Sequence, residues 1–82
     1  MKKETKVLKY TVIFELAEEG GYVVTVPALP GCVTQGDNFE QAKKMAKDAI
    51  KAYLAVLKED HEPIPRESDE HIEATILVPE PA

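Results

Sequence analysis

A long amphipathic segment that begins after Asn38 constrains the fold of this chain more than any other feature. Apolar residues recur in it at the i, i+3, i+4, i+7 spacing of one helical face, which predicts an α-helix. They are Ala42, Met45, Ala46, Ala49, Ile50, Tyr53, Leu54 and Leu57. Asn38 and Gln41 have the spacing of a capping box, and Pro63 excludes helix much beyond Asp60 or His61. A helix of about 22 residues with one apolar face needs a sheet to cover that face.

Three segments before this helix alternate apolar and polar residues at the period of two that a strand requires. The first segment, residues 8–16, places Leu8, Tyr10, Val12, Phe14 and Leu16 on its core face. The second and third segments are residues 22–26 and 32–35. Turns are expected at Gly20-Gly21 and at Leu29-Pro30-Gly31, because glycine accepts a positive φ and proline fixes its own φ near a turn value. We therefore expect an antiparallel three-stranded meander followed by the helix.

Residues 71–78, which follow the helix and a proline-containing connection, alternate again. Ile72, Ala74, Ile76 and Val78 fall on one side, which predicts a fourth strand. A crossover helix normally returns the chain to the same sheet in a right-handed sense, so this strand is expected beside the first strand and parallel to it. The expected fold class is α+β, with the strand order 3-2-1-4, in a single domain over residues 1–82.

The chain resembles the HicB-type antitoxins in several short motifs that occur in the same order along the sequence. These are Gly21-Tyr22-Val23 with Val26-Pro27, Leu29-Pro30-Gly31-Cys32, Gly36-Asp37-Asn38, Gln41-Ala42, Ala49-Ile50, Tyr53-Leu54 and Ile64-Pro65. Asn38 stands where the family commonly has Thr, but Asn caps a helix at least as well. The resemblance implies a partial RNase H-like fold without a working nuclease centre. It also implies that the protein binds and silences HicA, a small RNA-cleaving toxin.

The charge of the chain bears on its partners. A formal net charge of −5 opposes binding to nucleic acid, because phosphates require a basic surface. The cluster Lys43, Lys44, Lys47 and Lys51 is interpreted as a solvated helix face with acidic neighbours. An acidic chain can instead be steered toward a basic protein, and RNA-binding toxins are basic. The sequence has no apolar run long enough to span a bilayer, so we expect a cytoplasmic protein without membrane contact.

Candidate catalytic groups are scattered along the sequence. RNase H-like nucleases gather carboxylates around two divalent metals, and the nearest candidates here are Glu15, Asp48 and Glu73. Because no pattern brings them together, we predict no catalytic residue, no metal site and no cofactor. Cys32 is interpreted as a small buried residue, since no base or partner ligand stands at a suitable spacing.

The functional hypothesis is therefore an interaction protein that occludes the active surface of a toxin. The candidate contact residues, at a sheet edge and in the turn PALPGC, are Tyr22, Pro27, Leu29, Pro30 and Gly31. The substitution Leu29→Asp is expected to weaken this contact without disturbing the helix or the core. Relatives usually carry a C-terminal DNA-binding module, and because the chain ends soon after the fourth strand we expect none here.

Self-association, at least to a dimer, is also expected. One helix covers only one face of the sheet, and Val7, Ile13, Val23 and Val33 are apolar on the other face or at a strand edge. Two alternative functions remain open. One is a homo-oligomeric binding or regulatory domain with another partner, and the other is a metal-dependent nuclease.

Overall fold

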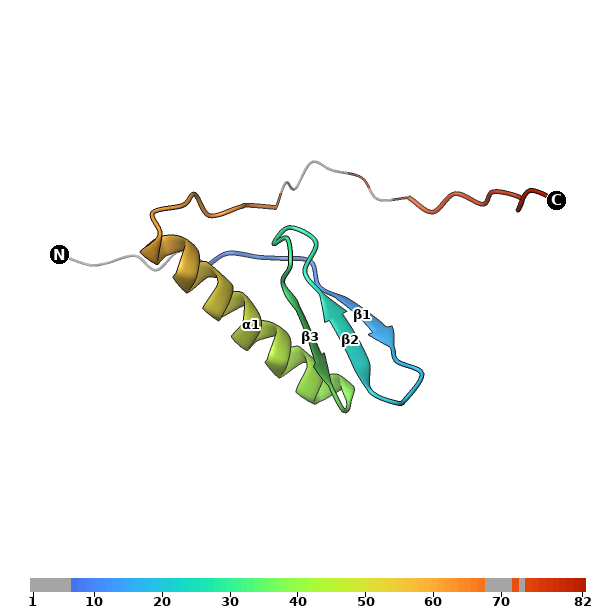
Figure 1. Ribbon diagram of the computed structural model, residues 1–82, viewed down its shortest axis with the longest axis horizontal. Coiled ribbons are helices and arrows are strands. Elements are labelled where there is room, and N and C mark those ends of the chain that lie inside the picture. Colours follow the sequence, from blue (N-terminus) through green and yellow to red (C-terminus); the bar gives the residue numbers. More distant parts are fainter. Residues whose placement is uncertain (1–6, 68–71, 73) are drawn as a thin grey trace.

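The computed structural model describes residues 7–67, 72 and 74–82 of the chain. Strands β1 (Ile13–Leu16), β2 (Tyr22–Thr25) and β3 (Val33–Gly36) form an antiparallel sheet in the order β1-β2-β3. Helix α1 (Phe39–Glu59) follows and packs across one face of this sheet (Figure 1). The α+β class, the three-stranded meander and the long helix are thereby confirmed.

The first core cluster lies between the middle of the sheet and the first half of α1. Phe14, Val24 and Thr34 stand in register across the three strands, so their side chains share one face of the sheet. Val24 has no exposed surface and packs with Ala42 and Ala46, the two buried residues of α1. The small alanine side chains allow the helix to lie close to the sheet, and the ring of Phe14 packs beside them.

Two glycines allow close backbone contacts at the point where β3 leads into α1. A Cβ atom at Gly36 would lie 2.5 Å from the backbone nitrogen of Ala42 and 2.6 Å from its Cα atom. A Cβ atom at Gly21 would lie 2.5 Å from the carbonyl oxygen of Gly36. No side chain fits at either position without moving the backbone, so this end of the fold depends on the absence of both Cβ atoms.

The N-terminus of α1 is capped as predicted. The Asn38 side chain accepts a hydrogen bond of 2.8 Å from the backbone N–H of Gln41. The Gln41 side chain in turn accepts a hydrogen bond from the backbone N–H of Asp37, one residue earlier than the Asn38 N–H that a standard capping box uses. The side-chain oxygens of Asn38 and Gln41 thus each accept a hydrogen bond from a backbone N–H group at the start of the helix.

The C-terminus of α1 forms a Schellman motif. The N–H groups of His61 and Glu62 donate to the carbonyls of Lys58 and Leu57, at 3.1 and 2.8 Å. His61 adopts a φ of 57°, the left-handed conformation that glycine usually supplies at this position. The predicted stop near Asp60 or His61 is confirmed.

Strand β1 is shorter than the predicted strand, because only its last four residues pair with β2. The predicted core face is correct for its first four members, Leu8, Tyr10, Val12 and Phe14, which are half-buried. It is wrong for Leu16, which is 78% exposed. Leu16 is the last residue of β1 and borders the hairpin turn, where an edge strand has few neighbours to cover a side chain.

After α1 the chain returns to the stretch that precedes β1. The Tyr10 hydroxyl donates a hydrogen bond of 2.6 Å to the carbonyl of Pro65. The Thr11 hydroxyl donates to one carboxylate oxygen of Glu67 at 2.8 Å, and the Thr11 N–H donates to the other. These contacts hold the start of the segment after α1 beside the stretch that leads into β1.

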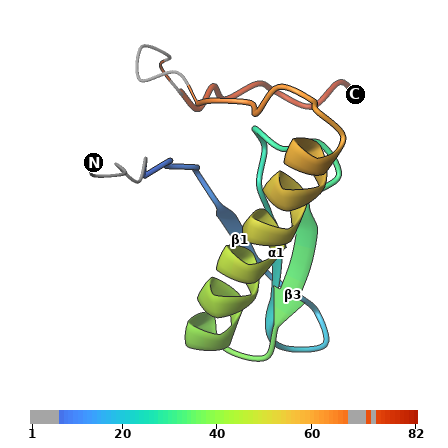
Figure 2. The same cartoon turned by 90° about the vertical axis from the view of Figure 1, so that its left-hand side faces the viewer.

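The predicted fourth strand is not confirmed. Ile72 and residues 74–82 have no strand pairing and are exposed. Residues 74–82, drawn in red, run clear of the sheet in Figure 1 and in Figure 2. His71 and Glu73, two further residues of the predicted strand, lie outside the described residues. The strand order 3-2-1-4 therefore stays a prediction.

Candidate interaction surface

The PALPGC turn, residues 27–32, joins β2 to β3 and has a closed backbone. Val26 N–H donates to the Cys32 carbonyl, Leu29 N–H to the Val26 carbonyl and Cys32 N–H to the Leu29 carbonyl, over 2.9 to 3.1 Å. Gly31 adopts a φ of 80°, which confirms the predicted role of glycine in this turn. The hydrogen bonds fix the shape of the loop before any partner binds.

The buried side chain of Leu29 packs the PALPGC turn against the core. It has no exposed surface and forms the second core cluster with Val26 and Cys32. The expectation that Leu29→Asp would spare the core is therefore wrong, because the substitution would bury an unpaired carboxylate. The flanking residues Pro27 and Pro30 are exposed, as a partner contact requires.

Tyr53 connects the tip of the turn to α1. Its hydroxyl donates a hydrogen bond of 2.8 Å to the carbonyl of Pro30, and its ring packs on the second core cluster. One side chain thus fixes the exposed tip of the turn relative to the helix.

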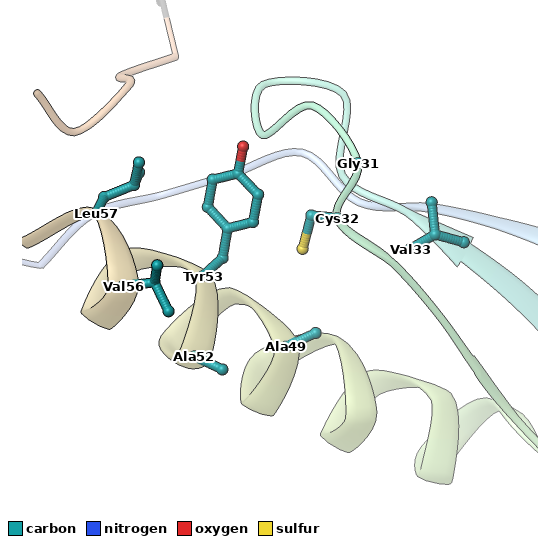
Figure 3. Close-up of a pocket in the computed structure, with 8 residues that line it drawn as sticks. All are labelled: Gly31, Cys32, Val33, Ala49, Ala52, Tyr53, Val56 and Leu57. Atoms are coloured by element: carbon teal, nitrogen blue, oxygen red, sulfur yellow. The ribbon is translucent and has the colours of Figure 1, made fainter. Parts of the chain in front are cut away.

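An open, mostly apolar groove of about 560 Å³ lies between the turn, the start of β3 and α1 (Figure 3). We call it the β3 groove. Its lining residues are Gly31, Cys32, Val33, Ala49, Ala52, Tyr53, Val56 and Leu57. Val33 and Val56 are 57% and 55% exposed, so two large apolar side chains face solvent here.

Val33 and Val56 are contact candidates that the sequence analysis missed. Val56 lies outside the regular apolar spacing of the helix, and an apolar residue outside the core face of a helix is a usable signal for a contact site. Val33 was assigned to the uncovered face of the sheet, but it also borders the β3 groove. The two residues line one groove only because α1 packs on β3, and no local pattern encodes that packing.

Cys32 lies in the β3 groove with its sulfur directed toward α1 (Figure 3). It is 6% exposed, and burial raises the pKa of its thiol because desolvation disfavours the charged thiolate. A thiol held in its neutral form is a poor nucleophile. This confirms the interpretation of Cys32 as a small buried residue.

Tyr22 does not share a site with the turn. It lies at the opposite end of β2, half-buried, with its ring 6.0 Å from that of Phe39 in an edge-on arrangement. Phe14 packs against the same Phe39 ring in a tilted arrangement, with 4.9 Å between the ring centroids and 58° between the ring planes. The structure therefore brings Pro27, Pro30 and Gly31 together and leaves Tyr22 in an aromatic cluster at the other end of the sheet.

Glu15 and Asp48, the two candidate catalytic carboxylates within the described residues, do not converge. Glu15 pairs with Val23 and points to the face of the sheet that α1 leaves open, whereas Asp48 lies on α1 itself. Glu73 lies outside the described residues. Across residues 7–67, 72 and 74–82, no group of three or more His, Cys, Asp or Glu side chains could hold a metal ion. A search of the same residues for a helix long and apolar enough to cross a membrane finds none.

The uncovered face of the sheet exposes apolar residues, as the sequence predicts. Ile13 is 43% and Val23 is 38% exposed, and Val33 continues this face on β3. Val7, ahead of β1, is 92% exposed. Exposed apolar surface of this kind is typical of proteins that bind other proteins.

Known proteins resemble this chain over most of its length. Residues 10–81 match the HicB-like antitoxin of bacterial toxin–antitoxin systems. A UPF0150 protein of Thermoplasma acidophilum is 52% identical over 65 residues, which cover 79% of this chain and 94% of that protein. Antitoxin HicB 1 of Photorhabdus laumondii is 45% identical over 60 residues, which cover 73% of this chain and 39% of that protein. Antitoxin HicB of Escherichia coli is 38% identical over 58 residues, which cover 71% of this chain and 42% of that protein.

The matched region is thus about two fifths of the length of each named antitoxin, and nearly all of the Thermoplasma protein. The family match includes the three strands, the PALPGC turn and α1, which are the elements that build the β3 groove. On this evidence the chain belongs to the HicB-like antitoxin family of bacterial toxin–antitoxin systems.

Proposed function

We propose that this chain binds a small, basic, RNA-cleaving toxin of the HicA type and covers the toxin's active surface. The proposed contact consists of the exposed tip of the PALPGC turn and the β3 groove beside it. The observation that carries the proposal is a groove that is lined by two exposed apolar side chains, Val33 and Val56, and lies beside a turn that Tyr53 holds in place. A preformed apolar surface of this kind favours protein binding because little conformational freedom is lost on contact.

The edge of β3 supports the same proposal. β2 pairs with one edge of β3, and within the described residues no strand pairs with the other edge. An extended segment of a toxin can add to such an edge through backbone hydrogen bonds while one of its apolar side chains enters the adjoining groove. The backbone contact would supply affinity, and the groove would supply specificity.

The charge of the chain favours a basic partner. The net charge is −5, and exposed acidic residues follow the end of α1 at Glu59, Asp60 and Glu62. This end of the helix lies at the same end of the molecule as the PALPGC turn (Figure 1). Long-range attraction therefore acts near the proposed contact, where it raises the association rate of a basic toxin.

The proposed mechanism is occlusion without catalysis. Two-metal hydrolysis requires carboxylates that share a pair of metal ions, whereas Glu15 and Asp48 lie on opposite sides of the sheet. The negative charge of the chain also disfavours direct contact with RNA or DNA. Inhibition would instead come from the area of the toxin that the antitoxin covers.

The substitution Val56→Arg tests the site. It places a positive charge in the wall of the β3 groove, where it removes an apolar contact and repels a basic toxin. We expect toxin affinity, measured by isothermal titration calorimetry, to fall by about tenfold or more. Ala55→Arg is the matched control, because Ala55 is exposed on the same helix and does not line the groove. Equal effects of the two substitutions, or none for Val56→Arg, would contradict the proposed contact.

A further inference from the structure

A second groove lies on the other side of α1, and the proposed toxin contact does not use it. We call it the β1 groove. It has a volume of about 850 Å³ and lies between α1 and the stretch of chain that leads into β1 and through it. The groove exists because α1 packs on β3 and β2 and leaves β1 largely uncovered, as Figure 2 shows with β1 and β3 on opposite sides of the helix.

The floor of the β1 groove is long, apolar and incompletely covered. Its half-buried residues are Leu8, Tyr10, Val12, Phe14, Ile50 and Leu54. Along the helix the groove extends from Phe39 to Leu54, which is about 22 Å at the rise of an α-helix. A trough of this length matches an elongated partner that lies alongside α1.

One rim of the groove is basic, although the chain as a whole has a net charge of −5. The charged residues among those that line the groove are all lysines, Lys43, Lys47 and Lys51. Their i, i+4, i+8 spacing places them in one row along α1, with about 12 Å between the first and the last. Lys43 lies 5.4 Å from the centroid of the Phe39 ring and 3.9 Å from the Glu40 carboxylate. Among the described residues, Lys47 and Lys51 have no ion-pair partner, so this rim can pair with acidic groups that another molecule supplies.

The distribution of these charges indicates the shape of the partner. A fatty acid has a single carboxylate and would pair with one end of the row only. Successive turns of a helix present acidic side chains about 6 Å apart, which is also the spacing of the lysines on α1. An added strand would need free backbone groups beside the groove, but residues 65–67 already contact Tyr10 and Thr11 there. A helix binds through its side chains and leaves those contacts in place.

We infer that the β1 groove binds an acidic amphipathic helix of another protein. The apolar face of that helix lies on the groove floor, and its acidic flank lies along Lys43, Lys47 and Lys51. A second copy of α1 in the groove would bring its own lysines toward this row, so the complementary partner is a different protein. The inference does not rest on toxin binding, because the β3 groove lies on the other side of α1 and these lysines would repel a basic toxin.

A designed peptide provides the first test. The probe is a hydrocarbon-stapled helix of about 16 residues, long enough to span the groove. It carries leucines at the i, i+3, i+4, i+7 spacing and three glutamates at the i, i+4, i+8 spacing on one flank. In the control peptide, glutamine replaces each glutamate. Fluorescence anisotropy with the full chain should show saturable binding of the probe, and binding of the control that is weaker by about tenfold or more.

Lys47→Glu and Lys44→Glu form a matched pair of variants. Both residues are exposed on α1 and both substitutions change the charge equally, but only Lys47 lines the groove. Lys47→Glu should weaken binding of the probe by about tenfold, and a probe with lysine in place of its central glutamate should restore the affinity. Lys44→Glu should leave the affinity within about twofold of the native value.

Methyl NMR spectra locate the bound probe. The signals of Val12 and Ile50 should shift when the peptide is added, whereas those of Val33 and Val56 in the β3 groove should not. Binding that does not saturate, equal effects of the two lysine variants, or shifts confined to the β3 groove would overturn the inference. Dodecanoate that displaces the probe at a lower concentration than unlabelled peptide would assign the groove to a fatty acid. Contacts between Ile50 and a second chain in a dimer would assign it to another copy, and either result would overturn the inference as well.

Discussion

Leu29 is the largest fully buried side chain among the described residues, although it lies in a turn between exposed prolines. The sequence correctly indicates a turn, because proline and glycine act through their own backbone geometry. It does not indicate that Leu29 points inward, since a turn has no periodicity from which a core face can be read. Burial of this residue depends on the helix that later packs above it.

We predict that Leu29→Ala lowers the free energy of unfolding by about 2 to 5 kcal/mol, the cost of removing a buried leucine side chain and leaving a cavity. Urea denaturation followed by circular dichroism measures this change. Val33→Ala, at a position that is 57% exposed, provides the comparison and should change stability far less. Similar losses for the two variants would show that Leu29 does not support the turn.

At the scale of elements, the helix was predictable to within a residue at both ends, whereas the strands were not. Asn38 and the apolar spacing act within a few residues, so they can be read locally. A strand exists only where another strand pairs with it, and β1 therefore pairs over four residues although the alternation begins at Leu8. The alternation in residues 71–78 predicts a strand in the same way but does not specify which sheet edge accepts it.

The C-terminal cap of α1 offers a test at this scale. His61 adopts a left-handed conformation that costs a residue with a Cβ atom roughly 1 kcal/mol. His61→Gly removes this cost and should raise the free energy of unfolding by up to about 1 kcal/mol, partly offset by the greater freedom of glycine in the unfolded chain. Thermal and urea denaturation measure the effect, with His61→Ala as the control that keeps the Cβ atom. A glycine variant less stable than the alanine variant would contradict this account of the cap.

At the scale of the whole molecule, α1 covers one face of a small sheet and leaves an apolar groove along each of its sides. The sequence predicts exposed apolar surface, because one helix is too narrow to cover a three-stranded sheet. The positions of the grooves could not be predicted, since each is formed by residues that are distant in sequence and meet only in the folded chain. In the proposed function, the β3 groove is the one that receives the toxin.

Co-expression with a HicA-type toxin from a neighbouring reading frame tests the central claim most directly. The native chain should restore growth to cells that produce the toxin and should co-purify with it as a stable complex. The Val56→Arg variant, which alters only the wall of the β3 groove, should restore growth poorly at equal protein level, whereas the Ala55→Arg variant should behave like the native chain. A native chain that neither restores growth nor co-purifies with the toxin would contradict the proposed function.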